Sequence, residues 1–148
     1  MPDTVTPPSS PARLTGEHFG LHIPFMDTIG LQSVHANHDE AYTVLKWSEQ
    51  NLNSRGDVHG GALMSALDYT LSAAARARIP QSGMATIEMS SQFLSPARGD
   101  IHVWAHCLRI VDDIAYCKAW AKDAKQRVVA SATASFKVVR RRAIGDRV

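Results

Sequence analysis

NSRGDVHGGALMSALD, residues 53–68, joins a polar loop to the start of an apolar helix. Asn53 and His59 precede two glycines, and one carboxylate, Asp68, lies inside the apolar run. A helix that begins at Gly60 leaves its first backbone N–H groups unpaired, and glycine lets a ligand approach them without a Cβ in the way. Those donors suit a carbonyl oxygen that becomes an oxyanion during acyl transfer. The stretch therefore predicts a helix N-terminus that holds developing negative charge, with Asp68 nearby as a base or nucleophile.

The helix is expected to run from about Gly60 to Arg78. At about 100° per residue, its leucines fall on one stripe and its alanines widen that stripe, so other structure should cover most of the helix. Asp68 lies about 100° from the centre of the stripe and about 12 Å along the axis from Gly60. One chain would struggle to place both groups at one site. A second subunit that supplies the opposite half of the site would resolve this distance.

Strand patterns flank the helix on both sides. LQSVHAN and AYTVLKW, before the helix, read as two strands joined by a tight turn, and residues 24–29 have room for a short helical turn. From Met84 to Val139, apolar and polar residues alternate in four further segments. This order predicts an α+β fold, with one antiparallel sheet of five to six strands and a long central helix buried against it.

The 148 residues are expected to form one domain, with 45% hydrophobic and 20% charged residues. Residues 1–16, rich in proline, are predicted to be a flexible leader, residues 17–139 the folded domain, and residues 140–148 a basic C-terminal tail. The formal net charge of +2 is small and forms no long basic stripe, so no nucleic-acid partner is expected.

Neither a membrane nor a metal is indicated by the residue patterns. No apolar run approaches the roughly 18 residues that a membrane span needs, and the N-terminus lacks the apolar region of a secretory signal, so a cytoplasmic location is expected. Cys107 and Cys117 fit no metal-binding or disulfide framework and are expected to be buried, reduced thiols. His18 and His22 have i, i+4 spacing, but no acidic residue completes a metal motif, so no metal is predicted.

The stretch NSRGDVHGGALMSALD resembles the signature of the PaaI-like branch of the hotdog-fold thioesterases, in the 4-hydroxybenzoyl-CoA thioesterase superfamily. That signature runs Asn, a spacer, Gly, a spacer, His-Gly-Gly, and then Asp in the helix. The similarity continues in TIEMSSQFLSPARGDI and extends upstream to IPFMDTIGLQSV. It spans roughly Phe19 to Val139 and leaves out the leader and the basic tail.

The resemblance implies a hotdog fold, in which an antiparallel sheet wraps around a long helix. It also implies a homo-oligomer, either a dimer or a dimer of dimers, with active sites at the subunit interface. Asp68 stands at the position of the catalytic carboxylate, which activates water or attacks the thioester directly. Gly60 stands where a backbone N–H polarises the thioester carbonyl. Asn53 and His59 match the polar residues that position the thioester or the water.

Further site residues follow from the same resemblance. Thr86 stands where related enzymes often carry a hydroxyl that orients water near the carboxylate. Gly61 extends the backbone surface that the substrate approaches. Coenzyme A carries phosphates, so basic residues are expected near it, and Arg98 and Arg140 are the candidates. The implied reaction is hydrolysis of an acyl-CoA, with an aromatic or medium-chain acyl group, to a free acid and CoA, without a metal or other cofactor.

Two other functions remain open at this point. A non-catalytic acyl-CoA-binding hotdog domain would share the same fold, although an intact Asp68 argues against a purely binding role. An enoyl-thioester hydratase is a further alternative, because the fold hosts that chemistry too. Such hydratases usually place their acid and base residues in other motifs, and none is found here. The acyl group and the choice between dimer and tetramer also stay open.

Overall fold

The computed structural model describes residues 13–140, so the predicted leader at residues 1–12 and the tail at residues 141–148 lie outside it. Its elements are β1 (Arg13–Leu14), η1 (Glu17–Gly20), α1 (Pro24–Ile29), β2 (Leu31–Asn37), β3 (Glu40–Leu45), η2 (Glu49–Asn51), α2 (Gly60–Arg78), β4 (Ser82–Phe93), β5 (Ile101–Val111), β6 (Ile114–Lys122) and β7 (Val128–Arg140).

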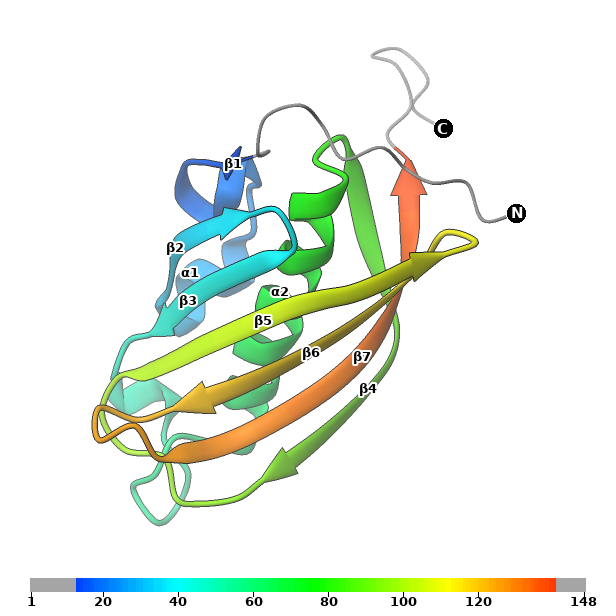
Figure 1. Ribbon diagram of the computed structural model, residues 1–148. Helices are drawn as coiled ribbons and strands as arrows, with labels where there is room; N and C mark the ends of the chain where they lie inside the picture. The colour runs from blue at the N-terminus through cyan, green and yellow to red at the C-terminus, as the bar shows by residue number, and fades with distance from the viewer. Residues whose placement is uncertain (1–12, 141–148) are drawn as a thin grey trace.

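The strands of residues 13–140 form one antiparallel sheet in the order β1-β2-β3-β5-β6-β7-β4. Figure 1 shows this sheet curving across α2, which lies on its concave side. The predicted α+β architecture is confirmed, and α2 has the predicted bounds. Six strands lie where the sequence predicted strands, and the seventh, β1, adds two residues that pair with Asn37 and Ala36 of β2. The fold therefore includes residues 13 and 14, which were predicted to belong to the leader.

The core forms where α2 meets the inner face of the sheet. Leu63, Leu67 and Leu71 of the helix are buried, as their common stripe predicted. The inner positions of β6 and β7 are mostly alanines, and their lack of bulk lets the helix approach the strands closely. These buried alanines are Ala115, Ala119, Ala121, Ala130, Ala132 and Ala134. Of the helices in residues 13–140, none combines the length and hydrophobicity of a membrane-spanning segment.

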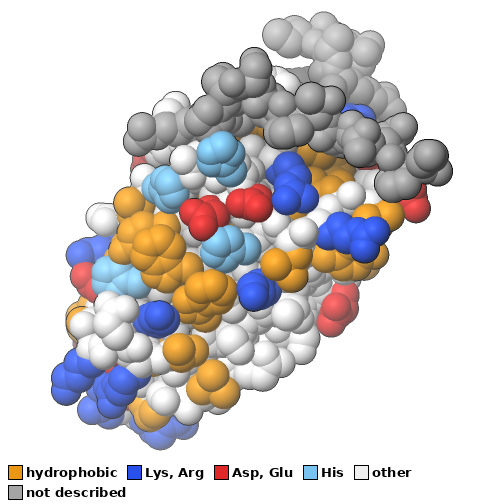
Figure 2. Space-filling view, in the orientation of Figure 1, with side chains coloured by type: hydrophobic (Ala, Val, Ile, Leu, Met, Phe, Trp, Pro, Cys, Tyr) orange, Lys and Arg blue, Asp and Glu red, His pale blue; other side chains and the backbone are white. Residues whose placement is uncertain are grey.

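The outer face of the sheet carries a row of stacked aromatic side chains. Tyr42 of β3 stacks on Trp104 of β5, with ring centroids 4.0 Å apart, and Trp104 pairs in register with Trp120 of β6. Figure 2 shows hydrophobic side chains gathered on this face among histidines and charged residues. The stacking covers the strands from the solvent side, so these aromatic residues contribute to sheet packing.

The two cysteines are free and buried, as predicted. Cys107 of β5 pairs in register with Cys117 of β6, and both side chains belong to the core. Contact with the Cys117 thiol lowers the pKa of Cys107, whereas the same contact and burial raise the pKa of Cys117. The pair is therefore a thiol–thiol contact inside the sheet.

Among the strands of residues 13–140, β4 pairs with β7 alone and forms one edge of the sheet. Its alternate residues pair with inward-facing residues of β7, so they face α2: these are Met84, Thr86, Met89, Ser91 and Phe93. A β-bulge between Thr86 and Glu88 shifts the alternation by one residue. We call the strip between these side chains and α2 the α2–β4 seam. No described strand lies beyond β4, so solvent reaches the seam at Phe93, which is 51% exposed.

Candidate active site

The loop that leads into α2 is closed by Asn53. Its Oδ1 accepts hydrogen bonds from the backbone N–H groups of Arg55 (2.9 Å) and Asp57 (3.1 Å), and its own N–H donates to the Asp57 carbonyl. Asn side chains close turns in this way because the short amide reaches backbone two residues on. The oxygen of Asn53 is therefore used within the loop. Its Nδ2 group donates to no atom of residues 13–140, so this amine is the half that is available to a ligand.

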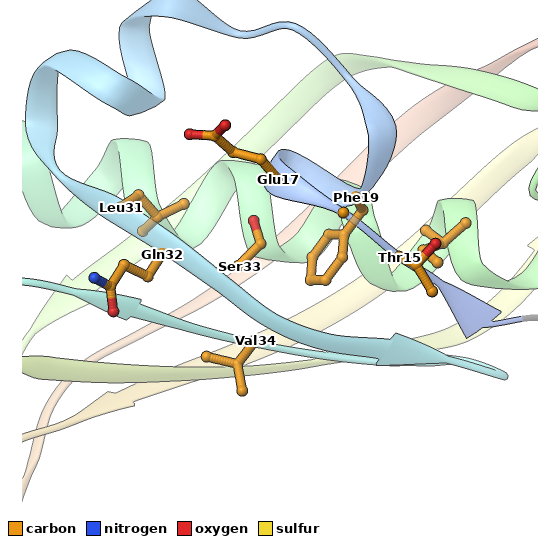
Figure 3. Close-up of a pocket in the computed structure, with 9 residues that line it drawn as sticks. Thr15, Glu17, Phe19, Leu31, Gln32, Ser33 and Val34 are labelled. Atoms are coloured by element: carbon orange, nitrogen blue, oxygen red, sulfur yellow. The ribbon is translucent and has the colours of Figure 1, made fainter.

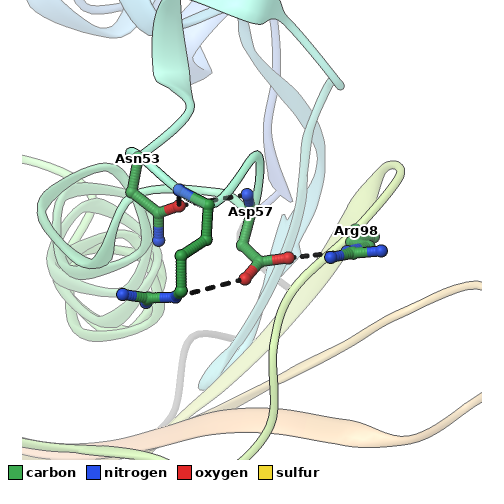
Figure 4. Close-up of polar contacts among 4 residues, drawn as sticks. Asn53, Asp57 and Arg98 are labelled. Carbon is green, nitrogen blue, oxygen red and sulfur yellow. Dashed lines mark hydrogen bonds and ion pairs between the residues drawn. The ribbon is translucent and has the colours of Figure 1, made fainter.

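A buried carboxylate ties this loop to the turn before β5. Asp57 is 5% exposed, and its Oδ1 accepts a hydrogen bond of 2.6 Å from Arg98 Nε, while Arg55 Nε lies 3.7 Å from its Oδ2 (Figure 4). Two cations compensate the cost of burying this charge. Arg98 was predicted to contact the substrate, and the structure gives it an intramolecular partner. Its side chain is nevertheless 68% exposed, so a phosphate can still approach it.

His59 caps the start of α2. Its Nδ1 accepts a hydrogen bond of 2.8 Å from the Gly61 N–H, and a Cβ on Gly61 would lie only 3.0 Å from the same nitrogen. The Gly61 amide is therefore used by His59 and its missing side chain makes room for that ring, while its predicted contact with a substrate stays a prediction. The Gly60 N–H donates to no acceptor within residues 13–140. This amide, the first of α2, is therefore available to donate a hydrogen bond to a substrate carbonyl.

Asp68 lies about two turns further along α2, half-buried on the α2–β4 seam. Its Oδ1 accepts a hydrogen bond of 2.8 Å from the Thr86 hydroxyl on β4. The structure thus brings together two predicted residues that lie on different elements. The hydroxyl fixes the orientation of the carboxylate and leaves Oδ2 free to contact water or a substrate.

The predicted site residues of one chain form two separate groups. Asn53, His59 and Gly60 surround the start of α2, whereas Asp68 lies about 12 Å further along the helix axis. Arg140 lies further still: it pairs with Ser82 after the C-terminal end of α2, about 28 Å of helix from Gly60, and its guanidinium donates to Asp113. Arg140 therefore does not join the helix start of its own chain.

Two residues on the seam were missed by the sequence analysis. Met64 is four residues from both Gly60 and Asp68, so it lies between them on one helix face, and it is 41% exposed. Phe93 lies at the start of the helix, where its ring is 3.6 Å from the position of a Cβ on Gly60. The i, i+4 spacing could have identified Met64. The bulge in β4 hides the face of Phe93 from simple alternation.

A cavity of about 620 Å³ lies elsewhere, between η1 and the first half of β2. Figure 3 shows Phe19, Leu31 and Ser33 among the residues that line it, and none of the predicted site residues is among them. The Ser33 and Tyr69 hydroxyls are hydrogen-bonded at 2.8 Å, and burial raises the pKa of Tyr69 to about 12. This side of α2 is therefore separate from the side that carries Asp68.

Three possible metal ligands also meet near this cavity. Each of three residues, Glu17, His18 and Asp27, offers one ligand atom, and these three atoms lie within 4.8 Å of one another. His18 Nε2 donates to Asp27 Oδ1 at 2.6 Å, while its Nδ1 has no hydrogen-bond partner in residues 13–140. Metal-bound histidines usually donate their second ring N–H to a carboxylate or carbonyl. His18 Nδ1 lacks such a partner within residues 13–140, so the hydrogen bond between His18 and Asp27 is better explained as a contact that holds η1 against α1.

Comparison with known proteins shows the family of this chain. The family described as "Domain of unknown function (DUF4442)" matches residues 12–144. The chain belongs to this family. A medium/long-chain acyl-CoA thioesterase of Salmonella typhimurium, YigI, is 26% identical over 145 residues, a match that covers 85% of this chain and 92% of that protein. A Halobacterium salinarum protein that is provisionally named an esterase is 32% identical over 94 residues, covering 57% of this chain and 62% of that protein, less than two thirds of its length.

Solved structures share the fold. The conserved protein PA5202 of Pseudomonas aeruginosa has a TM-score of 0.77 at 21% identity and covers 80% of this chain and 95% of its own. The PaaI protein of E. coli has a TM-score of 0.74 at 16% identity, covering 80% and 86%. The Streptococcus mutans protein smu.793, bound to acetyl CoA, has a TM-score of 0.70 at 16% identity, covering 76% and 91%. The chain therefore has the hotdog fold that the resemblance implied.

Proposed function

We propose that this protein is an acyl-CoA thioesterase, which hydrolyses a thioester to a carboxylic acid and free CoA. One observation carries the proposal: Asp68 is held by the Thr86 hydroxyl on the seam that begins at the available Gly60 amide. The two ends of this seam supply a carboxylate and an amide donor, the groups that thioester hydrolysis requires. The Salmonella relative that is named an acyl-CoA thioesterase supports the same reaction.

The reaction needs only these groups and water. The Gly60 N–H donates to the thioester carbonyl oxygen, which becomes an oxyanion as the nucleophile attacks. In one route, Asp68 removes a proton from water while the water oxygen bonds to the carbonyl carbon; the C–S bond then breaks and the CoA sulfur receives that proton. In the other route, Asp68 bonds to the carbonyl carbon, the C–S bond breaks and CoA leaves as a thiolate. Water then hydrolyses the resulting anhydride, which restores the Asp68 carboxylate and supplies the proton that the CoA sulfur takes up. Neither route uses a metal or a cofactor.

Two copies of the chain would complete the site. Within one chain, Thr86 marks the Asp68 end of β4 and Phe93 marks the Gly60 end. If the free β4 edges of two copies pair antiparallel around a twofold axis between these residues, each Asp68 end comes opposite the Gly60 end of the other copy. We therefore propose a homodimer with two sites at its interface, and two such dimers would form the tetramer.

The proposed substrate is a CoA ester with an aromatic or medium-chain acyl group. Exposed apolar side chains on the seam, Met64 and Phe93, favour an apolar acyl group. The solved neighbour that holds acetyl CoA supports CoA recognition by this fold. The exposed guanidinium of Arg98 is the candidate for a CoA phosphate. We propose that the protein acts on soluble acyl-CoA in the cytoplasm, without nucleic acid or membrane as a partner.

Thiol release from a panel of aromatic and straight-chain acyl-CoA esters tests this function. The wild type and Asp68→Asn, which keeps the shape of the side chain and its contact with Thr86, are measured side by side. We expect turnover by the wild type and a loss of at least a hundredfold in kcat in the variant. Equal turnover in both proteins would reject the role of Asp68. Binding of CoA esters without any turnover would instead indicate an acyl-CoA-binding domain.

A further inference from the structure

One buried hydroxyl on the α2–β4 seam has no part in the proposed reaction. Ser91 Oγ is shielded from solvent and has no hydrogen-bond partner in the part of the chain that the structure describes. Folded proteins pair nearly all buried polar groups, because an unpaired one loses its bonds to water without replacement. An unpaired hydroxyl beside a proposed substrate site therefore points to an atom that comes from outside the chain.

The register of β4 gives the position of this hydroxyl. Ser91 pairs with Ala132, an inward-facing residue of β7, so the Ser91 side chain faces α2. Phe93, two residues further on the same face, lies against Gly60. Two residues of strand span about 7 Å. The hydroxyl is therefore about 7 Å along the seam from the amide that is proposed to hold the thioester carbonyl.

The neighbours of Ser91 on the inner face of β4 are apolar. Met89 and Phe93 are its neighbours on the same face of β4, and Met64 is exposed on the facing side of α2 near Gly60. By contrast, Ser90 faces the outer side of the sheet and its hydroxyl accepts a hydrogen bond of 3.1 Å from Gln92. Ser91 is thus a polar group in an apolar lining, and Ser90 offers a matched control.

We propose that Ser91 is a specificity-determining residue that selects acyl groups with a hydrogen-bonding group about 7 Å from the thioester carbonyl over plain hydrocarbon groups. The proposal rests on the proposed thioesterase function, because the Gly60 amide defines where the carbonyl lies. A polar group at that distance pairs with the Ser91 hydroxyl. A plain hydrocarbon leaves the hydroxyl as unpaired as it is without ligand, so that substrate and its transition state lack this hydrogen bond.

The test compares hexanoyl-CoA with 6-hydroxyhexanoyl-CoA. In the second ester, the distance from the terminal hydroxyl to the carbonyl is comparable to the distance between the Ser91 hydroxyl and the Gly60 amide. We expect wild-type kcat/KM to be about tenfold higher for the hydroxylated ester, as one neutral hydrogen bond allows. Ser91→Ala should lose this preference by slowing the hydroxylated ester alone, and Ser90→Ala should keep it. Unchanged selectivity in Ser91→Ala, or an equal loss for both esters, would overturn the proposal.

A binding measurement separates this inference from the proposed function. Thioether analogues of the two CoA esters cannot be hydrolysed, and their Kd values are measured by calorimetry on the same three proteins. If no ester is hydrolysed, the thioesterase function fails, and the Kd ratio still tests Ser91 directly. The absence of a Ser91-dependent ratio, or of any binding, overturns the proposal.

Thermal unfolding distinguishes a structural role of Ser91 from a role in specificity. Because the Ser91 hydroxyl has no partner among residues 13–140, Ser91→Ala should keep or raise the Tm of the protein. A fall in Tm would show that a neighbouring subunit pairs with this hydroxyl, and the specificity role would then be rejected.

Discussion

Thr86 donates a hydrogen bond of 2.8 Å to Asp68 although 18 residues separate them along the chain. The helix α2 carries the carboxylate, the turn at residues 79–81 reverses the chain, and β4 returns beside the helix with its hydroxyl directed inward. The bulge that follows Thr86 changes which later residues of β4 face the helix. This contact joins the two elements that border the seam and fixes one carboxylate oxygen.

Replacement of Thr86 by valine tests the importance of this contact. Valine keeps the branched shape but cannot donate, so Asp68 loses its orienting partner. We expect kcat to fall about tenfold, in line with the loss of one hydrogen bond to a charged group. Thr86→Ser retains the hydroxyl and should stay within about threefold of the wild type. Equal activity of the valine and serine variants would show that orientation of Asp68 is not limiting.

Replacement of Gly60 by proline removes the proposed oxyanion donor with little change in backbone. Proline lacks the N–H and is tolerated at the first position of a helix, and His59 has the extended conformation that a residue before proline prefers. We expect a fall in kcat of about a hundredfold or more. Gly60→Ala keeps the amide, and its Cβ would make only an ordinary contact with Phe93, so it should remain active. Circular dichroism checks that both variants keep the helix, and similar activity in the two would contradict the role of the amide.

Mixed dimers test whether the site spans two chains. One dimer should combine an Asp68→Asn subunit, which lacks the carboxylate, with a Gly60→Pro subunit, which lacks the amide. An interface site then has one intact pair of groups per dimer, so about half of the wild-type activity should return. Differently tagged subunits allow the heterodimer to be purified before thiol release is measured. An inactive, correctly assembled heterodimer would place the site within one chain.

Removal of the Arg98 side chain tests its contact with the buried Asp57. In Arg98→Ala, only the more distant Arg55 remains beside that carboxylate, so we expect the free energy of unfolding to fall by about 1–3 kcal/mol in urea. Addition of Asp57→Asn should recover part of this loss, because it removes the buried charge. A rise in KM for acyl-CoA that persists in the double variant would assign a CoA phosphate to Arg98. An Arg98→Ala protein that is as stable as the wild type would show that the contact between Arg98 and Asp57 does not stabilise the fold.

The buried Tyr69 predicts a loss of stability at alkaline pH. Burial raises its pKa from 10.0 to about 12, so the unfolded chain releases the phenolic proton before the folded protein does. This contribution to stability is present below pH 10 and is lost as the pH rises toward 12. Tyr69→Phe should cost about 1 kcal/mol at neutral pH, through the lost bond to Ser33, but its Tm should fall less between pH 9.5 and 11.5. Parallel Tm curves for the two proteins would contradict this assignment.

The sequence by itself determined the secondary structure and supplied the candidate residues of the site. The leucine and alanine periodicity placed α2 at Gly60–Arg78, because a buried helix must repeat its apolar residues with its own turn. The same spacing separated Gly60 from Asp68 and predicted that one chain could not join them. Alternation along the later strands gave the antiparallel sheet, because side chains of a strand point to opposite faces.

The tertiary structure decided which side chains meet across elements. It joined Thr86 to Asp68, engaged Gly61 with His59, paired Arg98 with Asp57, and placed Arg140 at the far end of α2. Local sequence patterns describe the period of an element but not its register against a neighbour, and a single bulge in β4 moves every later residue to the other face. For this reason, only the pairing of β4 with β7 beside the helix shows that Ser91 and Phe93 lie on the seam.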